Sequence, residues 1–321
     1  MTRQLLAIAV ALWSGVSLAK AGDYPRHPIT FVVPFAAGGP LDTLARVVAE
    51  PMSRSLGQSI VIENVAGAGG SVGVERVVRA APDGYTISVG NWSTHVLNGA
   101  IYRLGYDLVA DLDPIALLPS APQVIVARKG IEATTLPELI AWTKTHQATL
   151  GTAGVGSAGH VSAVLFEKRT GAPITMVHYR GNGPAMTDLI GGHIDLMFDQ
   201  STTCLPQIRQ GTVRAYAATS AARLSSAPEI PTTDEAGLPD FHVAVWSGLW
   251  APKGTPADAI RALSTATREA LSDPAIRERL QNVGLSVPPP EQVSPEGLAE
   301  LQKTEIATWW PILKTANIKS E

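Results

Sequence analysis

The sequence is poor in cysteine and has no cluster of positive charge. Cys204 is the single cysteine among the 321 residues, which excludes an internal disulfide and a zinc site built from several cysteines. Lysine and arginine number 25 against 28 aspartate and glutamate residues, the net charge is −3, and no basic run occurs. Because nucleic acids are bound by clustered positive charge, no nucleic acid is expected as a partner.

A long hydrophobic run is also absent after the first 21 residues. Within them, Arg3 precedes an apolar segment over residues 5–19, and residues 19–21 read Ala-Lys-Ala, a small-residue cleavage signal. The segment is short for a membrane span, although a membrane anchor is the alternative. The pattern is typical of a secretory signal peptide, so residues 1–21 are predicted to be removed on export. Because the chain has no disulfide, the periplasm is the expected compartment.

Short apolar runs alternate with helical patterns along the rest of the chain. Residues 29–35 (ITFVVPF) are continuously apolar, as in a strand buried on both faces, and Pro40 opens a helical pattern. The alternation restarts at residues 123–128, and only helices follow residues 243–252. This order predicts an α/β protein with two halves.

The final helices allow two arrangements. They form a third unit, or they return to cover the sheet of the first half. The second arrangement gives two lobes joined by two crossings, one near Pro122 and one near residues 245–250. Two crossings make a hinge, and the cleft between two lobes is the expected ligand site.

A glycine-rich loop occupies residues 151–160 (GTAGVGSAGH), where Gly154, Gly156 and Gly159 match the G-x-G-x-x-G spacing of dinucleotide-binding loops. Such loops need an acid about twenty residues on, and residues 178–180 are His-Tyr-Arg instead. No dinucleotide or other cofactor is therefore expected. A strand–glycine–helix junction still offers free backbone N–H groups and a helix dipole to an anion.

Residues 34–40 (PFAAGGP) repeat this construction in the first half. Two such loops facing each other across the cleft would suit a small organic acid. The alternative is that both loops are merely tight turns. A serine hydrolase that uses Ser157 and His160 is a further alternative, but Val155 breaks the G-x-S-x-G pattern of a nucleophile elbow.

His193, Asp195 and Asp199 share one strand face by period-two spacing, which invites a metal interpretation, but Met197 lies on the same face. No metal site is therefore predicted. Asp199 at the carboxyl end of the strand is the better candidate for a ligand site, because ligands bind at these ends in open α/β sheets.

Four stretches together resemble the receptors of tripartite tricarboxylate transporters, the TctC or Bug-type family. They are YPRHPITFVVPFAAGGPLDTLAR, GQSIVIENVAGAGGSVGVERVVRAAPDGYT, YRGNGPAMTDLIGGHIDLMFD and IPTTDEAGLP. The resemblance covers nearly all of the chain after residue 21. It implies a two-lobed periplasmic binding protein fold that closes on a carboxylate and delivers it to a membrane permease, without being an enzyme.

The lobes implied are residues 22–122 plus 248–321 and residues 123–247. The ligand is implied to be a di- or tricarboxylate or an aromatic acid, and the receptor a monomer. The ligand-binding residues implied by matching loops are Phe35, Ala36, Gly38, Gly39, Trp92, Ser93, His95, Gly156, Ser157, His160, Tyr179, Asn182, Gly183 and Asp199.

The chain departs from the family pattern in the first loop, where Leu41 replaces a hydroxyl residue. Asp42 would repel a bound anion, so we interpret it as support for the helix start. Trp92 stands where small residues are common, and either stacks on an aromatic acid or packs in the core. Two alternatives stay open: a receptor for an uncharged ligand, and a loaded receptor that docks on a membrane sensor.

Overall fold

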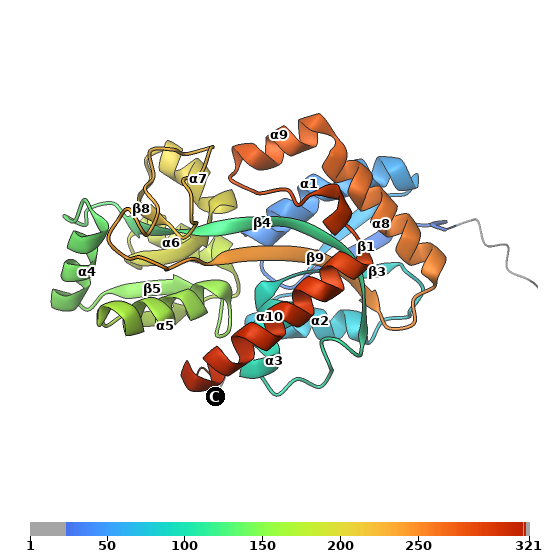
Figure 1. Cartoon of the computed structure of the whole chain (residues 1–321), viewed down its shortest axis with the longest axis horizontal. Coiled ribbons are helices and arrows are strands. Elements are labelled where there is room, and N and C mark those ends of the chain that lie inside the picture. Colours follow the sequence, from blue (N-terminus) through green and yellow to red (C-terminus); the bar gives the residue numbers. More distant parts are fainter. Residues whose placement is uncertain (1–23, 317, 319–321) are drawn as a thin grey trace, which may run out of the picture.

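The computed structural model of the chain describes residues 24–316 and residue 318. The predicted signal peptide lies outside the described residues. The molecule is a two-lobed α/β protein (Figure 1), as the alternation of apolar runs and helices predicts. Within the described residues, no helix is both long enough and apolar enough to span a membrane.

The first lobe is built on three parallel strands, of which the central one is buried and β2 is an exposed edge. The middle strand, β1, alternates its side chains between two layers of helices. Phe31 packs in one cluster with residues of α1 and α8, and Val32 packs in another with residues of α2 and α10. This explains the continuous apolar run. The elements are β1 (Ile29–Val33), α1 (Pro40–Leu56), β2 (Ile60–Asn64), α2 (Ser71–Val78), β3 (Thr86–Asn91), α8 (Ala257–Ser272), α9 (Pro274–Asn282) and α10 (Pro295–Ala316).

The second lobe repeats the plan with β5 in the middle of a parallel group. β5 pairs in parallel with β6 and β7, and α4 begins with a capping box between Thr135 and Glu138. Its elements are α4 (Leu136–Thr145), β5 (Thr149–Thr152), α5 (Ala158–Thr170), β6 (Thr175–His178), α6 (Asn182–Gly191), β7 (Leu196–Gln200), α7 (Ser201–Arg209) and β8 (Val213–Ala218).

Two antiparallel strands, β4 (Leu112–Arg128) and β9 (Ala244–Pro252), connect the lobes (Figure 1). The sheet order is β2-β1-β3-β9-β4-β7-β5-β6, and β8 also pairs with β4. β4 pairs with β9 as far as Pro122 and with β7 from Gln123 onward. This change of partner supports a lobe boundary at Pro122, although the exact division of the chain stays a prediction.

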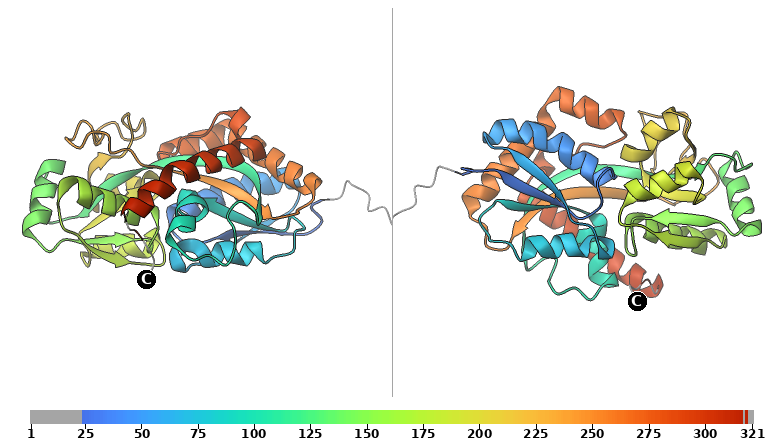
Figure 2. Two further views of the ribbon diagram at one scale, coloured as in Figure 1. Left: turned by 60° about the horizontal axis from the view of Figure 1, so that its bottom comes forward. Right: turned by 180° about the vertical axis from the view of Figure 1, so that it is seen from behind.

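The C-terminal helices return to the first half, which decides between the two arrangements left open by the sequence. α8 packs along α1, and α10 packs on β4. α10 then runs toward the second lobe (Figure 2), where the Lys168 ammonium on α5 donates to the Ala316 carbonyl at 3.3 Å.

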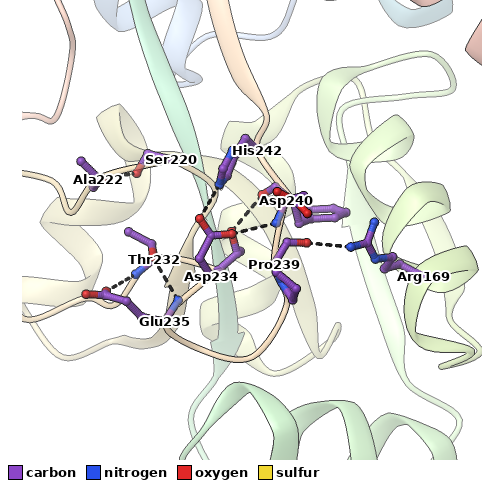
Figure 3. A network of polar contacts seen from close by, with 11 residues as sticks. Arg169, Ser220, Ala222, Thr232, Asp234, Glu235, Pro239, Asp240 and His242 are labelled. Carbon is purple, nitrogen blue, oxygen red and sulfur yellow. Dashed lines mark hydrogen bonds and ion pairs between the residues drawn. The ribbon is translucent and has the colours of Figure 1, made fainter.

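The proline-rich segment between β8 and β9 has no helix or strand, and polar contacts hold it in place (Figure 3). The Asp234 carboxylate pairs with His242 and accepts the backbone N–H of Asp240, both at 2.8 Å. Arg169 on α5 donates to the Pro239 carbonyl at 2.8 Å. The segment is thereby tied to the second lobe.

Candidate ligand site

A narrow cleft lies between the lobes, and in this form the space open to the centre of a water-sized sphere is only about 20 Å³. It lies at the carboxyl ends of β1, β3, β5 and β7, where open α/β sheets bind their ligands. The lining residues are Phe35, Gly39, Pro40, Leu41, Asp42, Asn91, Ser93, Gln123, Ala153, Ser157, Ala158, Gly159, Asn182 and Gln200.

The N-termini of four helices border this cleft: α1 belongs to the first lobe, and α5, α6 and α7 belong to the second. The lining includes Pro40 at the start of α1, Ala158 at the start of α5, Asn182 at the start of α6 and Gln200, the N-cap of α7. The first N–H groups of a helix lack partners within it, and the dipole adds partial positive charge there. No lysine or arginine belongs to the lining. The cleft therefore attracts an anion through neutral donors.

The glycine-rich loop connects β5 to α5 and reaches the cleft. Gly154 and Gly156 adopt φ angles of +112° and +75°, a region that favours glycine. Ser157 is the N-cap, and its hydroxyl oxygen accepts the His160 N–H at 3.4 Å. The hydroxyl hydrogen of Ser157 and the N–H of Ala158 are left for a ligand.

His160 does not form a hydrogen bond with Ser157 through its imidazole. The ring Nδ1 accepts the Gly156 N–H at 3.1 Å, and His178 packs edge-on against the ring at 5.2 Å. Burial, followed by the charge of His178, lowers the pKa of His160 to about 4, so the ring is neutral at pH 7. His160 thus holds the loop in shape. The arrangement lacks the hydrogen bond between nucleophile and base that a serine hydrolase needs.

Asp42 supports the loop of the first lobe, as interpreted from the sequence. Its carboxylate accepts the Gly38 N–H at 3.0 Å, two hydrogen bonds from Arg46 and one from Asn64. These donors occupy the carboxylate, although Asp42 belongs to the lining. Leu41 adds an apolar surface beside it.

Two amide side chains on the lining are oriented by their neighbours. The Asn91 oxygen accepts the Thr94 N–H at 3.2 Å, and the Gln123 oxygen accepts the Ser162 hydroxyl. Both side chains therefore keep their NH₂ groups for the cleft. Ser93, also on the lining, adds a hydroxyl. Sequence reasoning missed Gln123 and Gln200, because only the pairing of β4 with β7 brings them to the cleft.

Asp199 lies directly behind the lining and is fully buried. Its carboxylate accepts hydrogen bonds from the Asn182 amide, the Thr203 hydroxyl and the backbone N–H of Gln200. Burial outweighs these bonds and raises the pKa of Asp199 to about 6. Asp199 is therefore not a lining residue itself, and it acts on the cleft by holding the side chain of Asn182, which is one.

Trp92 and His95 lie in the core and are not among the lining residues, so for Trp92 the structure favours the packing alternative. Trp92 is 1% exposed and packs edge-on against Trp309 of α10, with the ring centroids 4.7 Å apart. His95 is fully buried and stacks on Trp250 at 3.7 Å. Ser93, at the start of the π-helical turn over Ser93–Leu97, belongs to the cleft lining, whereas its neighbours Trp92 and His95 do not.

Other predicted positions lie at the contact between the lobes. The Ala36 N–H donates to the Arg180 carbonyl at 3.1 Å, across the cleft. A side chain at Gly183 would place its Cβ 2.8 Å from the Ala37 carbonyl oxygen, so this approach requires glycine. The Tyr179 hydroxyl points elsewhere and donates to Asp188 at 2.7 Å.

A second contact between the lobes closes the other side of the cleft. The Tyr102 hydroxyl donates to the Val155 carbonyl at 2.7 Å, and a Cβ on Gly156 would lie 2.9 Å from the Asn98 side-chain oxygen. The structure therefore represents a closed form.

The residues of the metal alternative do not share one strand, because His193 and Asp195 precede β7. Asp195 forms an ion pair with Arg128 at 2.8 Å and accepts the Thr149 N–H, so its carboxylate is occupied. Among residues 24–316 and 318, no three histidine, cysteine, aspartate or glutamate side chains gather as a metal site would require. Cys204 is a buried, free cysteine.

Comparison with known proteins adds a family and three close structures. The model of the tripartite tricarboxylate transporter family receptor matches residues 44–318. The periplasmic binding protein BugD is 38% identical with a TM-score of 0.89, over 92% of this chain and all of BugD.

The other two structures contain ligands. MatC from Rhodopseudomonas palustris with bound malate is 40% identical with a TM-score of 0.87, over 90% of this chain and all of that one. A further R. palustris protein, solved with adipate, is 33% identical with a TM-score of 0.88, over 93% of this chain and all of that one. Both ligands are dicarboxylates.

Proposed function

Because the chain belongs to the tripartite tricarboxylate transporter family of receptors, we propose that it captures a small dicarboxylate in the interlobe cleft and delivers it to a membrane permease. The resemblance found in the sequence is thereby confirmed, and the family consists of solute-binding receptors, not enzymes. The proposed compartment is the periplasm, since BugD is a periplasmic binding protein and residues 1–21 have the pattern of a signal peptide.

The observation that carries the proposal is the convergence of four helix N-termini on a cleft without a cation. An anion in this place replaces its hydration shell by oriented N–H and O–H donors. Hydrogen bonds to charged groups contribute about 1.5–3 kcal/mol each, so a few of them hold a carboxylate without an arginine.

The two lobes offer donors for the two ends of a dicarboxylate. The second lobe presents the Ser157 hydroxyl and the first amides of α5, and the first lobe presents Ser93, Asn91 and the start of α1. The malate and adipate in related structures are consistent with a ligand that has two carboxylates. A ligand that engages both lobes stabilises the closed form.

The proposal is tested by isothermal titration of the mature protein against malate, succinate, glutarate, adipate and benzoate. At least one dicarboxylate is expected to bind, and its dimethyl ester, which has the same carbon skeleton without charge, is expected not to. NAD and NADP serve as controls for the glycine-rich loop. Equal binding of acid and ester would refute the role of charge, and binding of no acid would refute the function.

A further inference from the structure

The carboxylate of Asp199 accepts hydrogen bonds from three neighbouring groups. One oxygen accepts the Asn182 amide, and the other accepts the Thr203 hydroxyl. The Gln200 N–H also donates to this carboxylate. An ionised carboxylate only accepts hydrogen bonds, so the group that Asn182 turns toward it must be the NH₂ group.

The orientation of the Asn182 amide follows from this contact. Asn182 belongs to the cleft lining, and its Oδ1 has no donor within the part of the chain that the structure describes. Asn91 and Gln123 are oriented the opposite way, with their oxygens occupied by Thr94 and Ser162. The cleft therefore contains many donors and one side-chain acceptor whose direction is fixed by a neighbour.

We propose that Asn182 selects carboxylic acids that also carry a hydroxyl group, by accepting a hydrogen bond from that hydroxyl through Oδ1. Asp199 is the positioning residue that keeps the acceptor turned to the cleft. This inference rests on the proposed carboxylate-binding function and narrows its ligand to a hydroxy acid.

A hydroxyl matches this acceptor better than an ammonium group. A hydroxyl has one donor, whereas an ammonium has three and needs several acceptors when it is buried. The Asp42 carboxylate on the lining is already occupied by Gly38, Arg46 and Asn64. A hydroxyl also leaves its own oxygen free to accept from the neighbouring donors.

The test compares acids that differ by one hydroxyl. Malate, in both enantiomers, is titrated beside succinate, and 2-hydroxyglutarate beside glutarate. The wild-type protein is expected to bind the hydroxy acid of at least one pair more tightly, by about 5-fold or more, because the acid without the hydroxyl offers no donor to the Oδ1 of Asn182. Aspartate is included and is expected to bind more weakly than malate.

Two variants probe the acceptor and its orientation. Asn182→Ala is expected to reduce the ratio of affinities within the pair toward one. Asp199→Asn is expected to reduce it as well, because an amide at residue 199 can donate or accept and no longer fixes Asn182. Thr203→Val is the matched control, since it removes another donor of Asp199 and leaves the contact with Asn182. Its ratio is expected to stay within about 2-fold of wild type.

The ratio of the two affinities distinguishes loss of hydroxyl recognition from a structural defect, because a structural defect weakens the binding of both acids of a pair. Equal affinity for both acids in the wild type would overturn the inference and leave the carboxylate receptor standing. An unchanged ratio in Asn182→Ala, or aspartate binding more tightly than malate, would also overturn it. Binding of no acid at all would overturn the proposed function and the inference together.

Discussion

Replacing Asp199 by asparagine should change how stability depends on pH. The side chain is fully buried with no cation among its hydrogen-bonding partners, and burial raises its pKa to about 6 from the ordinary value of 3.8. The folded protein therefore binds this proton more tightly than the unfolded chain does. The resulting stabilisation is fully present below pH 3.8 and is lost as the pH rises through 6.

The size of the effect follows from the difference between the two pKa values. A shift of about 2 units corresponds to ~3 kcal/mol, at about 1.4 kcal/mol per unit. Integrated over the experimental window, about 2 kcal/mol of this is lost between roughly pH 4.5 and pH 7.5. Asp199→Asn removes the titrating group and leaves the other carboxylates in place, so their contributions cancel in the comparison.

The measurement is urea unfolding of the wild type and of Asp199→Asn at several pH values across this window. The free energy of unfolding of the wild type, minus that of the variant, should fall by about 2 kcal/mol as the pH rises. Thr203→Val retains the carboxylate and removes a hydrogen bond that lowers its pKa, so its free energy of unfolding should fall with pH at least as much as that of the wild type. A difference in the free energy of unfolding that stays constant with pH, or rises, would show that folding does not raise the pKa of Asp199.

Three further changes have expected outcomes. Ser157→Ala should weaken binding of the best acid by roughly 10- to 150-fold in isothermal titration, and unchanged affinity would remove the hydroxyl from the site. It should also lower the free energy of unfolding by about 0.5–2 kcal/mol, because the N-cap of α5 is lost. Trp92→Phe should preserve any change in intrinsic fluorescence caused by a ligand, because Trp92 packs on α10. Loss of that fluorescence change would place Trp92 in the ligand site. Tyr102→Phe should weaken binding by about 2- to 10-fold, because a hydrogen bond between the lobes is lost. The radius of gyration of the loaded variant in small-angle scattering should exceed that of the loaded wild type. Equal affinity would exclude a role of this bond in closure.

Local patterns were sufficient to predict much of the fold. The continuous apolar run at residues 29–35 predicted a strand buried on both faces, and β1 has helices on both sides. The glycine-rich loop at residues 151–160 was predicted to connect a strand to a helix, and it joins β5 to α5. Both features depend on residues close together in the sequence, which is why they could be predicted.

The missed features depend on contacts between distant segments. Gln123 and Gln200 meet because β4 changes partner at the lobe boundary, and no pattern in either segment signals this. Trp92 and Ser93 are adjacent, yet only Ser93 belongs to the cleft lining. The resemblance to the family identified the loop but not the direction of each side chain within it.

The contacts between the lobes include several individual hydrogen bonds. Two of them lie beside the cleft, from Ala36 to Arg180 and from Tyr102 to Val155, and others run from Ser201 to Gly284 and from Lys168 to Ala316. Each contributes about 1 kcal/mol net. A ligand that contacts both lobes adds its differential affinity for the closed form, and only that difference shifts the equilibrium. Neutral donors suit such a site, because they pair with the ligand when it is present and return to water when the cleft opens, without leaving an unpaired buried charge.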